Sequence, residues 1–136
     1  MIKSILFSSK VTGTSLALLV LRVALGLLMI THGWGKFEAY DTLIAKEQFP
    51  AIVISVKVSV ILAIFAELVC AALVVIGAFT RLATIPLIIT MLVAVLLIHA
   101  GDPIGQKELA ILYLVGFIAL FIMGPGKFSI DQLVKK

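Results

Sequence analysis

The sequence is poor in charged residues and has almost no cysteine. Of its 136 residues, 13% are charged and 62% are hydrophobic, and the mean hydropathy is +1.27. A soluble domain of this length cannot enclose so much apolar surface, so the composition excludes a soluble globular fold and indicates an integral membrane protein. The single cysteine, Cys70, excludes an internal disulfide and also a dithiol–disulfide relay within the chain.

The sequence also lacks a basic patch and the motifs that hold haem or metal ions. Its net charge is +4, but the lysines are scattered singly, as at the ends of membrane spans, which does not favour a nucleic-acid partner. No Cys-x-x-Cys-His sequence is present for haem attachment. His32 and His99 could act as axial haem ligands, or could hold a metal ion with a carboxylate, but both are minor alternatives. We therefore predict no metal site and no cofactor held by the chain alone.

Four continuous apolar segments dominate the chain instead. Each is close to the roughly 20 residues that a helix needs to cross a bilayer, and continuous runs favour helices over the alternating strands of a barrel. The predicted helices cover residues 14–35, 55–79, 82–100 and 107–124, followed by a short tail, 127–136. We therefore predict an all-α membrane protein with one domain, residues 1–136, that forms a four-transmembrane-helix antiparallel bundle.

Four spans place both termini on the same side of the membrane. That side carries Lys3, Lys10, Arg81, Lys127, Lys135 and Lys136, whereas the other side carries Lys36, Lys46, Lys57 and Lys107. Basic residues near the ends of spans are enriched on the cytoplasmic side. We therefore predict a cytoplasmic (inner) membrane location with both termini in the cytoplasm.

Ionisable residues inside the apolar segments are the candidate functional residues. Each costs about 2.5–3.5 kcal/mol at the centre of a span, so it normally faces the bundle and has a partner or a function. They are Arg22, His32, Glu67, His99 and Glu108, with Lys36 at the edge of its segment. Helical rise places Arg22 and Glu67 within about 6–9 Å of the same height, which leaves an ion pair between them open.

The same helical rise brings three titratable groups to one level. His32, His99 and Glu108 all lie near the outer ends of their helices, about 24–27 Å from the inner edge, with Lys36 just beyond. Because a histidine titrates near neutral pH, this level is where proton chemistry is expected.

Arg22, Gly33 and Lys36 fall on one face of the first predicted helix, together with other small residues. A face of this kind suits either close contact between helices or a slot for a ligand. Structural alternatives stay open for single residues. Lys36 could be a helix-end lysine that extends towards water, His32 an interfacial histidine, and Asp102 a simple turn residue.

The order and spacing of these segments resemble the DoxX family of small four-helix membrane proteins. The stretches that carry the resemblance are LRVALGLLMITHGWGKF, AELVCAALVVIGAFTRLA, MLVAVLLIHAG and KELAILYLVGFIALFIMGPGKFSID. Some members of that family are associated with thiosulfate:quinone oxidoreductase, and others with membrane oxidoreductase complexes that handle thiol and oxidative stress. The resemblance therefore implies a four-helix bundle and an oxidoreductase subunit. Vitamin K epoxide reductase has a similar architecture but uses cysteine pairs, which this chain lacks.

We predict a redox membrane subunit that binds a quinone, or a similar apolar or anionic small molecule, between the helices near the outer leaflet. The predicted catalytic residues, which would transfer protons, are His32, Glu108 and His99. The predicted substrate-binding residues are Arg22, Lys36, Glu67 and Gly33. A redox partner protein would supply the electrons, so whether the chain is itself an enzyme stays open.

Two other functions fit the same residues. The chain could be a non-enzymatic scaffold or accessory subunit, in which the buried charges only hold the bundle together. It could also be a small-solute or proton pathway, although the third predicted helix offers only His99, at its end. The expected partners are the lipid bilayer, a redox protein and, because glycine-bearing faces allow dimers, a second copy of the chain.

Overall fold

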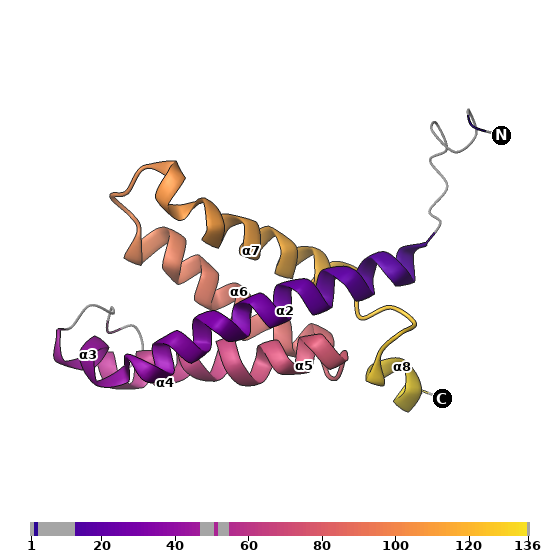
Figure 1. Ribbon diagram of the computed structural model, residues 1–136, viewed down its shortest axis with the longest axis horizontal. Helices are drawn as coiled ribbons and strands as arrows, with labels where there is room; N and C mark the ends of the chain where they lie inside the picture. The colour runs from indigo at the N-terminus through magenta and orange to yellow at the C-terminus, as the bar shows by residue number, and fades with distance from the viewer. Residues whose placement is uncertain (1, 3–12, 47–50, 52–54, 136) are drawn as a thin grey trace.

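The computed structural model describes residues 2, 13–46, 51 and 55–135. Every regular element in this part of the chain is helical, and four helical spans are long and apolar enough to cross a membrane. Successive spans run in opposite directions along the long axis of the molecule (Figure 1). The predicted all-α fold with four transmembrane helices is therefore confirmed.

The first two spans form one side of the bundle. The first is α2 (Thr14–Glu38), which is followed by the short helix α3 (Tyr40–Ala45). The second consists of α4 (Val56–Phe65), the π-helical turn η1 (Ala66–Cys70) and α5 (Ala71–Ile76). α2 packs along η1 and α5. The second span therefore has a widened turn in its middle, where α2 crosses it.

Glycine allows this close approach. A Cβ atom at Gly26 would clash with the side chain of Val75, and one at Gly33 would lie 2.8 Å from the Cβ of Glu67. Small residues let the backbones of membrane helices approach each other closely, which strengthens their van der Waals contact. The glycine-bearing face of α2 is therefore a helix-contact face over this length.

The third and fourth spans form a hairpin on the other side (Figure 1). The third is α6 (Thr80–Val93), extended by a second π-helical turn, η2 (Ala94–Ile98), and the fourth is α7 (Ile104–Met123). α6 packs against α7 and also against α5, and α7 reaches α2. The second span ends three residues earlier than predicted because Gly77 adopts a left-handed conformation, with φ of 73°, that ends α5.

The interior of the bundle is mostly apolar, and so is its outer surface. Buried side chains from all four spans form the core, including Leu18, Met29, Val74, Leu87, Phe117 and Leu120. Many other large apolar side chains of the same spans point outward and are exposed. An exposed apolar surface on every span is the surface that a bilayer covers, so the chain is an integral membrane protein in contact with lipid.

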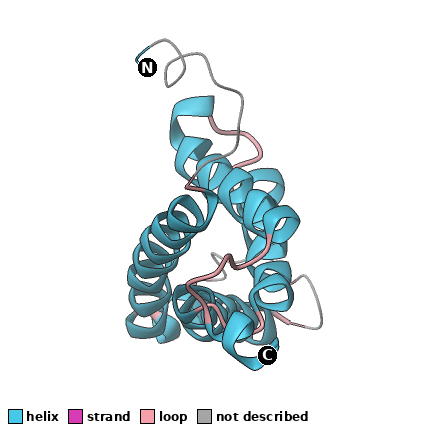
Figure 2. Ribbon diagram, turned by 90° about the vertical axis from the view of Figure 1, so that its right-hand side faces the viewer, coloured by secondary structure: helices cyan, strands magenta, loops and turns pink. Residues whose placement is uncertain are grey.

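A C-terminal segment closes the end of the bundle at which α2 begins (Figures 1 and 2). We call residues 124–135, which include helix α8 (Ile130–Lys135), the clasp. The carboxylate of Asp131 accepts hydrogen bonds from the backbone N–H groups of Phe79 (2.7 Å) and Thr80 (2.9 Å). The N–H of Asp131 donates to the carbonyl of Gly77 at 2.9 Å. The clasp therefore satisfies backbone groups at the turn between the second and third spans.

The charge on Asp131 is part of this arrangement. Burial alone would raise the pKa of Asp131, but hydrogen bonds from Thr80 and Phe79 and the positive charge of Arg22 outweigh it and hold the pKa below its ordinary value. The ionised carboxylate is thus the form that the folded clasp favours.

Candidate functional site

A cavity lies between the spans at the end of the bundle opposite the clasp. Its volume is about 170 Å³, and residues from α2, η1, α6, η2 and α7 line it. Its polar lining residues are His32, Lys36, Glu67, Thr90, His99, Gln106 and Tyr113. The cavity therefore brings together four of the predicted site residues, His32, Lys36, Glu67 and His99, from three different spans.

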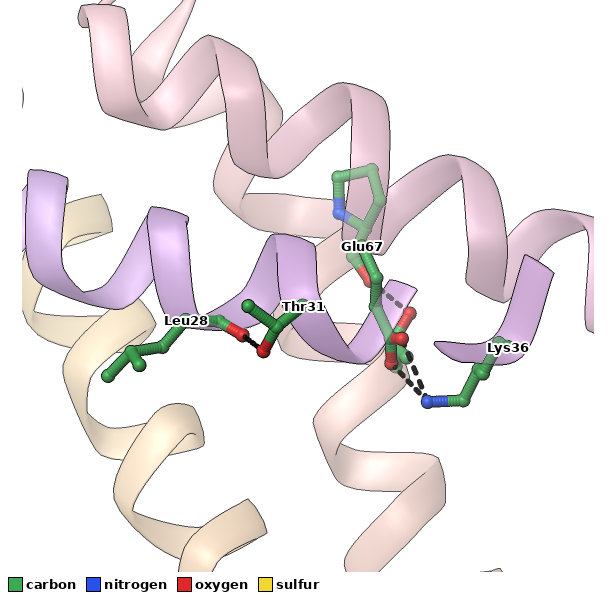
Figure 3. Close-up of polar contacts among 6 residues, drawn as sticks. Leu28, Thr31, Lys36 and Glu67 are labelled. Atoms are coloured by element: carbon green, nitrogen blue, oxygen red, sulfur yellow. Dashed lines mark hydrogen bonds and ion pairs between the residues drawn. The ribbon is translucent and has the colours of Figure 1, made fainter. Parts of the chain in front are cut away.

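Lys36 and Glu67 form an ion pair in the wall of this cavity. The ammonium nitrogen of Lys36 donates to both carboxylate oxygens of Glu67, at 2.8 and 2.9 Å (Figure 3). The side chain of Glu67 is 1% exposed and that of Lys36 is 27% exposed. The alternative in which Lys36 extends towards water is therefore wrong, because its ammonium group binds the carboxylate of Glu67 in η1.

The local structure explains why these two side chains meet. Glu67 lies in η1, and π-helical turns of this kind occur frequently at functional sites because they shift side chains out of the regular helical register. Gly33 contacts Glu67 directly and brings α2 close to η1. Lys36 follows Gly33 by one turn on the same face, so it reaches the carboxylate. Gly33 thus acts by bringing two helices together.

Arg22 lies away from the cavity and binds the clasp. Its guanidinium group is buried and donates hydrogen bonds to the carbonyl oxygens of Pro125 and Phe128, the latter at 2.8 Å. The ion pair between Arg22 and Glu67 that helix depth left open is therefore wrong. The prediction compared only the heights of two residues on two helices. It could not show that a segment about a hundred residues further along the chain folds back over Arg22 and supplies carbonyl groups to it. Arg22 ties α2 to the C-terminal clasp.

His32 and Tyr113 form an aromatic contact across the cavity, from α2 to α7. Their ring centroids are 5.6 Å apart and the rings are close to perpendicular. Tyr113 is 5% exposed and lines the cavity. His32 is exposed although it lines the cavity, so it lies at the opening.

His99 lies at the end of the third span, directly after η2. Its Nδ1 is 2.8 Å from a carboxylate oxygen of Asp102. The turn that carries both residues is closed by a backbone hydrogen bond from Asp102 to the carbonyl of His99, at 3.0 Å. Asp102 is therefore more than a turn residue, because it also binds the ring of a cavity-lining histidine.

Glu108 does not line the cavity. It is exposed, whereas Gln106, Ala110 and Tyr113 on the same helix face the cavity at spacings of three and four residues. Helical rise alone placed Glu108 at the level of the two histidines, but the direction of its side chain on α7 separates it from them.

Sequence reasoning also missed residues that the cavity contains. Tyr113, Gln106 and Asp102 were not nominated as site residues. For Tyr113 a signal was present, because a hydroxyl group inside an apolar span must find a partner. Among the described residues, no three histidine, cysteine, aspartate or glutamate side chains gather as a metal site would require.

The arrangement as a whole combines an apolar chamber with a few groups that can bind or exchange protons. Lys36 and Tyr113 supply hydrogen-bond donors, Glu67 supplies a carboxylate, and His32 and His99 can donate or accept a proton. The hydrogen bonds of such groups are strongest where water is excluded, as between membrane helices. The cavity can therefore hold and orient a small molecule with a polar group.

Comparison with known proteins identifies the family of this chain. The sequence pattern of the DoxX family matches residues 17–100. An uncharacterized protein of Haemophilus influenzae is 30% identical over 131 residues, which cover 91% of this chain and 87% of that protein. An uncharacterized membrane protein of Mycobacterium tuberculosis is 28% identical over 140 residues, which cover 88% of this chain and 82% of that protein. No solved structure matches the chain significantly. The chain therefore belongs to the DoxX family of membrane proteins.

Proposed function

We propose that this DoxX protein binds the ring of a quinone, or of a similar small aromatic molecule, in the inter-helix cavity, and that it serves as a subunit of a membrane oxidoreductase. The observation that carries the proposal is the cavity itself, in which the partly buried ion pair of Lys36 and Glu67 and the side chains of His32 and Tyr113 line an otherwise largely apolar chamber. Small-molecule sites typically combine an apolar wall with a few converging polar groups.

The size of the cavity supports a ligand with one ring. Its volume is about 170 Å³, and an apolar protein cavity of about 150 Å³ is known to take up benzene. A quinone ring therefore fits, while an apolar tail would extend past the opening at His32 into the lipid. The exposed apolar side chains of Ile98 and Leu109, which also line the cavity, suit contact with such a tail.

The polar groups have separate roles in this proposal. The hydroxyl of Tyr113 and the ammonium group of Lys36 donate hydrogen bonds to a carbonyl oxygen and stabilise negative charge that develops on it. His32 and His99 exchange the protons that accompany electrons in quinone chemistry. Glu67 holds Lys36 in place. Glu108, which is outside the cavity, and Arg22, which binds the clasp, have no role in the binding step.

The remaining parts of the proposal concern membrane orientation and partners. The excess of basic residues on the clasp side supports cytoplasmic termini in the inner membrane, so that the cavity lies near the outer leaflet. A partner oxidoreductase supplies or removes the electrons, and the chain supplies the binding site and the proton-exchanging groups.

Fluorescence provides a direct test, because Trp34 is the only tryptophan of the sequence. It lies on α2 between His32 and Lys36, two cavity-lining residues. We expect a decyl-benzoquinone to quench Trp34 saturably in lipid nanodiscs. Tyr113→Phe removes only the hydroxyl, so we expect it to weaken binding about three- to tenfold, the effect of one hydrogen bond.

A pair of matched variants separates binding in the cavity from partition into lipid. Ala110→Leu adds volume to the cavity wall, whereas Ala24→Leu adds the same volume to an exposed position on α2. Saturable quenching should disappear in Ala110→Leu and persist in Ala24→Leu. Quenching that rises linearly with quinone in the wild type, or that is equal in both variants, would overturn the proposal.

A further inference from the structure

We infer that Asp102 is a positioning residue that fixes the tautomer of His99, and that the cavity therefore selects ligands with a hydroxyl group, such as quinols and phenols. The inference rests on the proposed function, because it concerns the ligand of the same cavity. It assigns a role to a residue that sequence reasoning treats as part of a turn, and it narrows the class of ligand.

The contact between the side chains of Asp102 and His99 determines which ring nitrogen carries the proton. An ionised carboxylate can only accept hydrogen bonds, and it lies 2.8 Å from Nδ1 of His99. Nδ1 must therefore carry the proton in that contact. In a neutral imidazole the second nitrogen is then bare, because the hydrogen bond made by one ring nitrogen decides the state of the other. Nε2 of His99 is left as a hydrogen-bond acceptor.

Local structure holds this contact in place. η2 ends at Ile98, and the chain turns at His99 so that Asp102 follows three residues later. The N–H of Asp102 donates to the carbonyl of His99, which closes the turn, and Pro103 follows it with a fixed backbone angle. The backbone thus presents the carboxylate to the ring.

The groups around the cavity include both hydrogen-bond donors and acceptors. Lys36 and the hydroxyl of Tyr113 are donors, so they suit a ligand oxygen that accepts. The carboxylate of Glu67 is already engaged by Lys36. Because His99 lines the cavity, its Nε2 offers an acceptor that can pair with a donor on the ligand. A quinol or phenol hydroxyl provides one, whereas a quinone carbonyl or an aryl ether does not.

The tautomer of His99 can be measured without any ligand. The sequence contains only two histidines, so ¹⁵N-histidine spectra of the wild type and of His32→Gln assign both rings. Under alkaline conditions at which the same spectra show neutral rings, we expect His99 to be protonated at Nδ1. In Asp102→Asn we expect a shift towards the Nε2-protonated form, because an amide no longer enforces one tautomer.

Ligand selectivity gives the functional readout. Calorimetry with protein-loaded nanodiscs, corrected with empty ones, would compare decylhydroquinone, decyl-benzoquinone and the dimethyl ether of the quinol. The wild type should bind the quinol about three- to tenfold more tightly than the other two probes, the effect of one hydrogen bond. In Asp102→Asn that preference should fall below twofold. Asp41→Asn changes an exposed aspartate on α3 and should leave both the tautomer and the preference unchanged.

The outcomes distinguish this inference from the proposed function. If the wild type binds none of the probes, the proposed function fails whatever the tautomer of His99. If probes bind but His99 is protonated at Nε2, or if the ether binds as well as the quinol, the cavity remains a binding site and the role of Asp102 is overturned.

Discussion

The ion pair in the cavity wall leads to a sharp prediction about stability. Lys36→Met removes the ammonium group and leaves the carboxylate of Glu67, which is 1% exposed, without its partner. Glu67→Gln instead leaves the ammonium group of Lys36, which is 27% exposed and can turn towards water. The two substitutions break the same contact, but we expect them to have unequal costs because the two groups differ in burial.

The magnitudes follow from the burial of each partner. Removing one partner of a buried pair typically costs about 3–5 kcal/mol. We therefore expect Lys36→Met to lower the free energy of unfolding by about 3 kcal/mol. For Glu67→Gln we expect about 1 kcal/mol, as for an exposed pair.

Unfolding in mixed micelles, titrated with a denaturing detergent and followed by circular dichroism, would measure these differences. The double variant Lys36→Met with Glu67→Gln should recover much of the loss, since it leaves no unpaired charge. Lys57→Met is the matched control, because Lys57 is exposed and has no ion pair among the described residues. Equal costs for the two single variants, or a loss below about 0.5 kcal/mol for Lys36→Met, would refute the reasoning.

Three further predictions concern helix contact and the clasp. Gly33→Ala places a Cβ against Glu67 and should destabilise the protein by about 1–3 kcal/mol in the same unfolding assay, whereas Gly35→Ala, where nothing lies within 4 Å, should be neutral or stabilising. Arg22→Lys should cost about 2 kcal/mol, because a single ammonium nitrogen lacks the two separate guanidinium nitrogens that bind the two clasp carbonyls; an unchanged midpoint would contradict this. The lowered pKa of Asp131 means that its stabilisation is complete above the ordinary aspartate range and lost as the pH falls below it. The stability difference between wild type and Asp131→Asn should therefore be largest near neutral pH and vanish in acid, and a difference that does not change with pH would argue against it.

Much of the architecture followed from the composition and the apolar segments. Four continuous runs of the right length permit little other than four helices, since a bilayer requires every backbone group to be satisfied within the segment. Helical rise also placed His32 and His99 near one level, and both line the cavity. These inferences depend on local properties of one helix at a time, and such properties can be predicted from the sequence.

The partners of the charged residues were not predictable in the same way. Glu67 pairs with Lys36 because η1 and the absent side chain at Gly33 set how two helices meet. Arg22 binds carbonyl groups that a distant turn supplies. Both outcomes depend on tertiary contacts that helical rise does not encode.

The direction of side chains around a helix was the other property that the sequence analysis did not predict. Glu108 has the right height but lies on the wrong face of α7, whereas Tyr113, five residues further on, lies on the right face. The angle of 100° per residue was applied to the first span but not to the fourth. With one cavity-lining residue of α7 known, the same angle would place Tyr113, and not Glu108, on the face towards the cavity.

The central claim is that the inter-helix cavity is a ligand site, and photo-crosslinking tests it most directly. A decyl-benzoquinone with a photoreactive group on the ring would be activated in nanodiscs, and the labelled residues located by mass spectrometry. The account predicts labelling at cavity residues such as Met29, Met91 and Tyr113, which excess unlabelled quinone suppresses. Labelling confined to exposed lipid-facing residues such as Leu28 and Val115, without suppression, would contradict it.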